Sequence, residues 1–302
     1  MASERELNKR IRSVKNISQV TSALAAVSAS KASRAQKQVE ATRAYAGKAF
    51  EILHNLASQP GVGDNAHPLL TVRPQIKNTA LVMVTGDRGL AGAYNASMVS
   101  RAEAFIRAMN GPVQLITVGR KGRDLMIRRG YNVVATFEKM PDPPSILDIT
   151  AIAKIVTADF LSGKVDQVFI GYTDFVNLLT RIPRVKQLLP LKPLDFEGMA
   201  VSEYVSKVDL TGVAERVYSY EPDPSALLSI VLPRFTELQI FQSVLEALAS
   251  EHSARMVAMN NATDNAGELI DILTLERNKA RQTSITNEIL DIVGGAEAAV
   301  KG

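Results

Sequence analysis

Two long stretches without proline occupy the two ends of this chain, and they limit its fold more than any other feature. Residues 1–59 contain no Pro and a single Gly, Gly47. Residues 234–293 also contain no Pro, and Gly267 is their only Gly. Because proline breaks helices, both stretches favour continuous α-helix. At 1.5 Å per residue the two predicted helices reach about 80 Å and about 105 Å, far beyond the ordinary globular helix.

Apolar residues recur at spacings of three and four in the first stretch, which predicts one apolar helix face similar to a heptad seam. The predicted seam consists of Leu7, Ile11, Val14, Ile17, Val20, Leu24 and Val27. Beyond Val27 small residues continue the face at Ala29, Ala32 and Ala35. Ser3 and Glu6 have the spacing of a capping box, which indicates a helix start.

The second stretch has its own start, face and stop signals. Asp223 is placed as an N-cap and Pro224 as the first helical residue, while Pro233 predicts a kink or a later start. Gly294 and Gly295 predict the end of the helix. The predicted apolar face contains Leu238, Phe241, Leu245, Leu248, Met256, Met259, Leu269 and Leu273, beside an alanine ridge at Ala254, Ala258, Ala262 and Ala266.

Between the two helices the pattern changes to short apolar runs rich in β-branched residues. The predicted buried strands are 80–84, 113–118, 132–137 and 165–172, and helical patterns separate them. This alternation predicts βαβ units, and residues 175–191 predict a hairpin or an edge strand. The expected fold class is therefore α/β: an antiparallel coiled coil of the terminal helices plus a Rossmann-like domain. The expected domains are residues 1–59, 76–208 and 222–295.

Positive charge is concentrated in the first helix. Between Met1 and Lys48 there are ten Lys or Arg against three acidic residues, giving a net charge of +7, whereas the whole chain carries +4. A helix this basic indicates an anionic partner such as nucleic acid, a lipid surface or an acidic protein surface. On composition alone, a solvated helix face explains the charge equally well.

Composition and motifs exclude several function classes. The chain has no Cys, which excludes disulfides, thiolate metal sites and thiol nucleophiles. No run of eighteen apolar residues is present, and the charged first turns do not resemble a signal peptide, so a soluble intracellular protein is expected. A phosphate loop of the form G-x-x-x-x-G-K-[ST] is missing. The three histidines, His54, His67 and His252, lack metal-ligand spacing.

One turn leaves an enzymatic interpretation open. Residues 85–92 read TGDRGLAG between a predicted strand and a predicted helix, where a phosphate could meet helix N–H groups. The glycine spacing is G-x-x-G-x-x-G, however, and Asp87 would repel a phosphate. A tight structural turn is the favoured reading, and the basic turn at residues 119–122 is a second, weaker candidate.

Several segments together resemble the gamma subunits of F-type ATP synthases, in the bacterial type without the cysteine-bearing insertion of the chloroplast relatives. The matching stretches are RIRSVKN at 10–16, QVTSAL at 19–24, DRGLAG at 87–92 with Asn95, ARMVAM at 254–259, ATDNA at 262–266, NKARQTSITNEI at 278–289 and IVGGA at 292–296. The family commonly carries Cys where Ala91 stands and Met where Leu24 stands. Both replacements are small changes between apolar residues, so packing should survive.

The resemblance implies a mechanical role and no chemistry. Gamma subunits are the rotating central stalk, whose paired helices turn inside a ring of three alpha and three beta subunits. The expected partners are therefore alpha, beta, epsilon and the membrane c-ring, and no nucleic acid. No catalytic residue, cofactor or metal is expected. The expected location is peripheral, on the cytoplasmic face of a bacterial plasma membrane, and the expected activity is coupling of ion flow to ATP synthesis or hydrolysis.

The resemblance also implies three groups of contact residues. The contacts with beta, called catch contacts here, correspond to Arg281, Gln282 and Thr286. The foot that faces the rotor ring corresponds to Tyr218, Tyr220 and Glu221. The basic residues Arg10, Arg12 and Lys15 are expected to meet acidic loops of the alpha and beta subunits.

Overall fold

A computed structural model of the chain describes residues 3–57, 67–192 and 223–300, and the side chains of all of these except 224, 225 and 297–300. Its elements, in chain order, are α1 (Glu4–Ala57), β1 (Thr79–Val84), α2 (Tyr94–Ala108), β2 (Val113–Val118), α3 (Arg120–Arg128), β3 (Val133–Phe137), α4 (Ile146–Leu161), β4 (Gln167–Phe175), β5 (Arg181–Leu189) and α6 (Pro224–Val300). The predicted strands and helices agree with these bounds to within a few residues. The chain divides into two compact units. Unit 1 is Met1–Ser28 with Met256–Gly302, and unit 2 is Ala29–Arg255.

Unit 2 is built on a five-stranded sheet in the order β3-β2-β1-β4-β5. The first four strands are parallel, and β5 pairs antiparallel with β4 as an edge strand. The strand order follows from the βαβ units, because helices must cross over between parallel strands. The predicted α/β class is confirmed, and residues 181–189 take the edge position.

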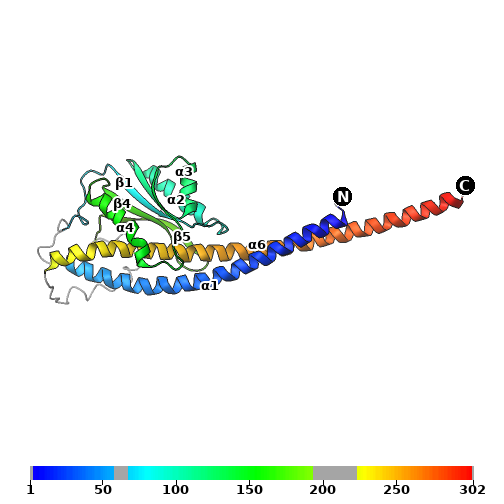
Figure 1. Cartoon of the computed structure of the whole chain (residues 1–302), viewed down its shortest axis with the longest axis horizontal. Coiled ribbons are helices and arrows are strands. Elements are labelled where there is room, and N and C mark those ends of the chain that lie inside the picture. The colour runs from blue at the N-terminus through cyan, green and yellow to red at the C-terminus, as the bar shows by residue number, and fades with distance from the viewer. Residues whose placement is uncertain (1–2, 58–66, 193–222, 301–302) are drawn as a thin grey trace. The chain divides into compact units, whose positions relative to one another are not determined.

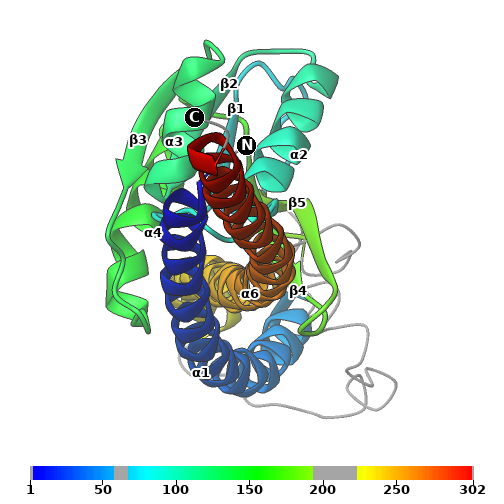
Figure 2. The same ribbon diagram turned by 90° about the vertical axis from the view of Figure 1, so that its right-hand side faces the viewer.

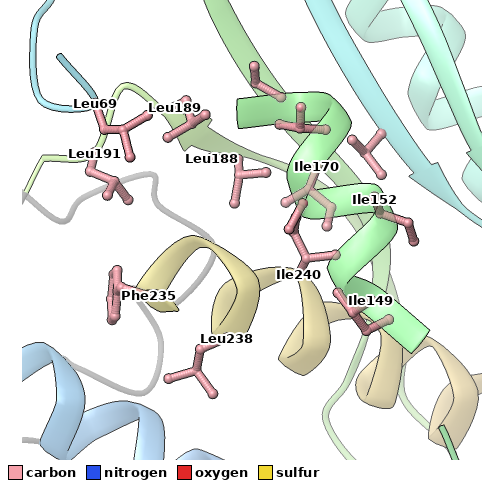
Figure 3. Close-up of a cluster of buried hydrophobic side chains, with 14 of the residues drawn as sticks. Leu69, Ile149, Ile152, Ile170, Leu188, Leu189, Leu191, Phe235, Leu238 and Ile240 are labelled. Atoms are coloured by element: carbon pink, nitrogen blue, oxygen red, sulfur yellow. The ribbon is translucent and has the colours of Figure 1, made fainter. Parts of the chain in front are cut away.

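The side chains of β1 alternate between two apolar layers. Leu81 and Met83 pack with Met98 of α2 and Met126 of α3 on one face of the sheet. The intervening residues of β1 face a larger core formed with α1, α4 and α6. In Figure 3, Ile149 and Ile152 of α4 and Ile170 of β4 gather near Ile240 of α6. Burial on both faces explains why these strands read as continuous apolar runs.

Within unit 2, α1 and α6 run side by side, as Figure 1 shows. Ala35 and Val39 pack against Leu245 and Ala249. Further along α1, Phe50 meets Phe235 with ring centroids 6.2 Å apart. As residue numbers rise on α1 they fall on α6, so the two helices are antiparallel, as predicted.

The start of α6 is as predicted, but its end is not. The N–H of Ala226 donates to Asp223 Oδ1 at 2.9 Å, so Asp223 caps the helix and Pro224 occupies its first position. Pro233 lies inside the helix and does not delay its start. The prediction that Gly294 and Gly295 end the helix is wrong, because α6 continues to Val300. Glycine lowers helix stability without forbidding the helical conformation, so the pair is tolerated.

Candidate partner-binding surfaces

In unit 1 the first part of α1 pairs with the last part of α6, and the two lie side by side in both Figure 1 and Figure 2. Leu7 and Ile11 form a buried cluster with Leu273. About three turns further on, the hydroxyl oxygens of Thr21 and Thr263 are 2.7 Å apart. The pairing is again antiparallel, as a coiled coil of the two chain ends requires.

The predicted seam on α1 is only partly correct. Leu7 and Ile11 are buried, but Ile17, Val20 and Val27 are 54%, 59% and 55% exposed. Within unit 1, the buried positions after Val14 are instead Thr21, Ala25 and Ser28. On the opposite helix Leu269 was also predicted to face the seam, and it is 44% exposed. A strict heptad repeat, with a mean period of 3.5 residues, selects these small and polar residues instead of the larger apolar ones.

The correction leaves an apolar stripe on the outside of α1, formed by Ile17, Val20 and Val27. The basic residues Arg12 and Lys15 are also exposed, and among the described residues neither has an ion pair. Arg10 is exposed and pairs with Glu6 one turn earlier, at 2.8 Å. At about 100° per residue, Arg12 lies about 140° and Lys15 about 160° around α1 from Ile17. The described surface of unit 1 therefore differs from side to side.

The end of α6 has no cover within unit 1. Ala280 still packs against the cluster of Leu7, but every residue from 281 to 296 is exposed. In Figure 1 the red end of α6 continues past the start of α1. The large apolar side chains along this end are Ile285, Ile289, Leu290, Ile292 and Val293, each about half exposed or more. Exposed apolar surface of this extent marks a contact surface.

The predicted catch residues Arg281, Gln282 and Thr286 lie at the beginning of this exposed end. Arg281 has no ion pair within the described part of the chain, so its guanidinium is available to an acidic partner. The hydroxyl of Thr286 donates to the carbonyl oxygen of Gln282 at 2.9 Å, one turn earlier in the same helix. Thr286 therefore offers a partner its hydroxyl oxygen as an acceptor and its methyl group. The predicted ring-facing residues Tyr218, Tyr220 and Glu221 lie outside the described residues.

The glycine-rich turn at residues 85–92 is filled by its own side chains. The carboxylate of Asp87 accepts hydrogen bonds from the N–H groups of Arg120 at 2.9 Å and Lys139 at 2.8 Å. Asp87 thus occupies the N-terminus of α3, where a phosphate at the second basic turn, residues 119–122, would have to bind. Oδ1 of Asn95 accepts a hydrogen bond from the N–H of Gly86 at 2.9 Å. The cavity beside the turn measures about 70 Å³, too small for a nucleotide.

The second basic turn is also shaped by packing. Gly119 has a φ of 96°, and a Cβ there would lie 2.1 Å from the carbonyl oxygen of Thr85. Only glycine fits this backbone conformation and this contact. Among the described residues, no group of three His, Asp or Glu side chains could hold a metal ion. None of the described helices is long and apolar enough to span a membrane.

Comparison with known proteins identifies the family to which the chain belongs. The family model described as ATP synthase matches residues 3–299. The ATP synthase gamma chain of Roseiflexus castenholzii is 46% identical over 303 residues, covering 99% of both chains. That of Chloroflexus aurantiacus is 44% identical over 301 residues, with the same coverage. The chain belongs to the ATP synthase gamma chain family. As predicted, it is therefore a non-catalytic subunit of an ATP synthase.

Two solved ATP synthase structures contain a chain with the same fold as this one. The rotor of the Euglena gracilis mitochondrial ATP synthase superposes with a TM-score of 0.64 at 19% identity, covering 93% of this chain and 98% of that one. The central stalk of the Tetrahymena thermophila enzyme gives a TM-score of 0.59 at 23% identity and covers 80% of this chain. The predicted combination of a terminal coiled coil with a Rossmann-like domain is confirmed.

The family's signature turn has a structural role in this chain. Residues 85–92 were considered above as a phosphate site. The geometry instead shows a turn in which the Asp87 carboxylate and the Gly86 carbonyl oxygen accept hydrogen bonds from α3 and from the loop after β3. The sequence reasoning missed that Tyr94, just after the turn, donates from its hydroxyl to the carbonyl oxygen of Ala247 in α6, at 3.0 Å. The residues share no sequence signal, since they are far apart in the chain.

Proposed function

We propose that this chain is the central-stalk rotor of a bacterial-type ATP synthase, turning within a ring of three alpha and three beta subunits. Rotation would couple transmembrane ion flow to ATP synthesis or hydrolysis at sites on the alpha and beta subunits. The observation that carries the proposal is the bare end of α6, where residues 281–296 are all exposed and several are large and apolar. A surface of this kind needs a partner to exclude water.

The proposed contact residues are those that the family resemblance implies. Arg281 would donate to a carboxylate of beta, since a guanidinium is a forked donor suited to bidentate pairing. Gln282 and Thr286 would add polar contacts beside it. On α1, Arg10, Arg12 and Lys15 would meet acidic loops of alpha and beta.

The mechanism requires a surface that differs from side to side. On α1 the exposed cations Arg12 and Lys15 lie on a different side from the exposed apolar residue Ile17. A rotating surface of this kind presents different contacts in turn to three identical catalytic sites. Each site then responds according to the differential free energy of those contacts in its open and closed states.

The rest of the assembly is proposed from family membership alone. Tyr218, Tyr220 and Glu221 would face the c-ring, and the epsilon subunit would bind beside the α/β domain. In this proposal the chain would lie on the cytoplasmic face of a bacterial plasma membrane, as a peripheral subunit without nucleic-acid partners. The domain limits 1–59, 76–208 and 222–295 belong to the same proposal.

Reconstitution tests the proposal directly. The chain is mixed with alpha and beta subunits of the same organism, the complex is isolated by size, and ATP hydrolysis is measured. We expect one copy to join three of each partner and to raise hydrolysis well above that of alpha and beta alone. Failure to co-purify, with alpha and beta shown to associate with each other, would exclude the rotor assignment.

A further inference from the structure

Within unit 2, residues Glu246–Arg255 of α6 cross the carboxyl ends of the parallel strands, and we call them the crossing segment. In open α/β sheets this edge holds ligands, at the point where the strand order reverses. That point lies here between β1 and β4, because β1 connects outward to β2 while β4 lies on its other side. In this chain the crossing segment occupies the place of a ligand.

The loop after β1 holds one side of the crossing segment. The hydroxyl of Tyr94 donates to the carbonyl oxygen of Ala247 at 3.0 Å. Arg255 donates through Nε and Nη2 to the carbonyl oxygen of Gly89, at 3.4 Å each. Ala91, Tyr94 and Ala254 form a separate buried apolar cluster. These contacts join the signature turn to α6 by both polar and apolar groups.

Gly86 and Glu251 leave no room for a side chain between them. A Cβ placed on Gly86 would lie 2.7 Å from the carboxylate carbon of Glu251, so a side chain there forces that carboxylate to move. Glu251 is in turn held by Arg255, with Nη2 and Oε1 2.5 Å apart. Burial in this contact raises the pKa of Glu251.

The loop after β4 holds another side. The hydroxyl of Ser250 donates to the carbonyl oxygen of Thr173 at 3.0 Å, and that of Ser253 to the carbonyl oxygen of Leu178 at 2.5 Å. Arg181 donates to Ser253 Oγ at 3.1 Å. Thr173 lies near the carboxyl end of β4, Leu178 lies in the loop that follows, and Arg181 is the first residue of β5.

The loop after β3 supplies a third contact. Asp142 lies 3.2 Å from His252 of the crossing segment and accepts a 2.6 Å hydrogen bond from Lys31 of α1. At about 100° per residue, the residues of the crossing segment that make these contacts span more than half of the circumference of α6. Contacts distributed in this way oppose rotation of the helix about its own axis as well as sliding along it.

We propose that the crossing segment is the joint through which torque passes between the α/β domain and α6, with Tyr94 and Arg255 as its positioning residues. The proposal rests on the rotor function proposed above. It predicts that the joint stays closed through every turn. Loosening it should allow ATP hydrolysis to continue while less of the resulting rotation reaches the α/β domain.

The first test loosens the joint with Gly86→Ala in the complete membrane complex, reconstituted into vesicles. ATP hydrolysis and ATP-driven ion pumping are measured on the same preparation. We expect the ratio of pumping to hydrolysis to fall several-fold, and Tyr94→Phe to lower it in the same direction by less. Gly267→Ala is the matched control, because a Cβ at that position of the same helix meets nothing within 4 Å. A loss of protein alone would lower both activities and leave their ratio unchanged.

The second test locks the joint. The chain has no Cys, so Ala91→Cys with Ala254→Cys introduces the only pair of thiols in this subunit. After oxidation we expect pumping and hydrolysis to equal those of the reduced form, since the two residues never separate. In the Gly86→Ala background, oxidation should raise the lowered ratio and reduction should lower it again.

The outcomes separate the two proposals. If the unmodified chain does not assemble with alpha and beta, the rotor function fails. If it assembles and pumps, but Gly86→Ala keeps the normal ratio, only the joint is overturned. The joint is also overturned if oxidation stops pumping in the Ala91→Cys, Ala254→Cys variant that keeps Gly86. In that case α6 must move relative to the sheet during rotation. Should Gly86→Ala fail to fold, this oxidation result decides alone.

Discussion

His252 Nε2 lies 3.2 Å from Asp142 Oδ2, where α6 meets the loop after β3. The imidazole is buried, and the contact has ion-pair distance without hydrogen-bond geometry. Burial lowers the pKa of His252 to about 4, and the charge of Asp142 opposes this shift only in part. The nearby cations Arg255 and Lys31 lower it further. His252 is therefore neutral in the folded protein at pH 7.

This neutral histidine should make stability depend on pH in a defined window. Its pKa is about 4 in the folded state against an ordinary 6.5, so the unfolded chain binds more protons between these values. Stability should be fully present above about pH 6.5 and decline as pH falls toward 4, by up to about 3 kcal/mol from this group. Urea unfolding of His252→Gln and the unmutated chain across this range measures the difference. Equal pH slopes for the two chains would refute the assignment.

Glu246 should act in the opposite direction. It is fully buried, and burial raises its pKa well above 4.5, with the neighbouring Asp174 adding to the shift and Arg43 opposing it. The folded state thus holds a proton that the unfolded state releases, so stability present at low pH is lost as pH rises through the folded pKa. We expect Glu246→Gln to be more stable than the unmutated chain at pH 8, with a smaller gap at pH 5. Glu268→Gln, an exposed glutamate of the same helix, should show no such gap in the same unfolding measurement.

The contrast between the sheet and the coiled coil shows what the sequence could predict. The strands were predictable because their apolar runs are long enough, and bounded clearly enough, to define buried elements. The large apolar seam of α1 was predictable only up to Val14, because the next buried positions are small or polar. The small residues Ala32 and Ala35, predicted to continue the face, are buried. Thr21 is buried opposite Thr263, and each hydroxyl can also donate to a carbonyl of its own helix. A search for periodic apolar residues does not identify buried positions of this kind.

The contacts of the crossing segment were beyond prediction for a different reason. Glu246, Glu251 and His252 read as ordinary polar residues of a helix surface, and only the sheet behind them makes them buried. The pairing of Glu251 with Gly86 joins residues on separate elements, so no local spacing indicates it. The ring-facing residues Tyr218, Tyr220 and Glu221 and the upper domain limit at 208 remain predictions, because they lie outside the described residues.

The corrected seam gives a matched pair of variants. Ile11 is 6% exposed and Ile17 is 54% exposed on the same helix. Ile11→Ala should lower the free energy of unfolding of the paired helices by about 2 kcal/mol, as truncation of a buried side chain does. Ile17→Ala should change it by less than about 0.5 kcal/mol. Helical circular dichroism during urea unfolding of the isolated chain measures both. If both variants lower the free energy of unfolding by similar amounts, Ile17 packs in the seam after all.

The basic residues of α1 should act through long-range charge. Arg12→Glu and Lys15→Glu should leave the isolated chain's stability within about 0.5 kcal/mol, because neither side chain has an ion pair among the described residues. Coupling of hydrolysis to pumping in the complete complex should fall, and the loss should depend on salt because exposed charges are screened. Arg10→Glu offers a comparison in which an existing pair with Glu6 is also broken. If coupling is unchanged in both Arg12→Glu and Lys15→Glu, the proposed contact of these residues with acidic loops of alpha and beta is excluded.

Arg281 gives the most direct test of the contact with beta. Its exposed guanidinium has no ion pair within the described chain, so Arg281→Ala should leave the isolated protein's unfolding unchanged to within about 0.5 kcal/mol. In the complex with alpha and beta, losing a charge-assisted hydrogen bond should cost about 1.5–3 kcal/mol of contact free energy. Torque generation and the rate of ATP hydrolysis should therefore change together.

Thr286→Val separates a specific contact from a general effect of altering this end of α6. The hydroxyl of Thr286 donates within its own helix, so a partner loses only an acceptor when valine replaces it. We expect a smaller change in hydrolysis than for Arg281→Ala, and Arg281→Lys should fall between them because lysine keeps the charge but not the fork. Hydrolysis by the reconstituted complexes, measured at matched protein concentration, ranks the three variants. If Arg281→Ala behaves like the unmutated chain, the catch contact does not lie at this residue, and the apolar residues beyond it must carry the binding.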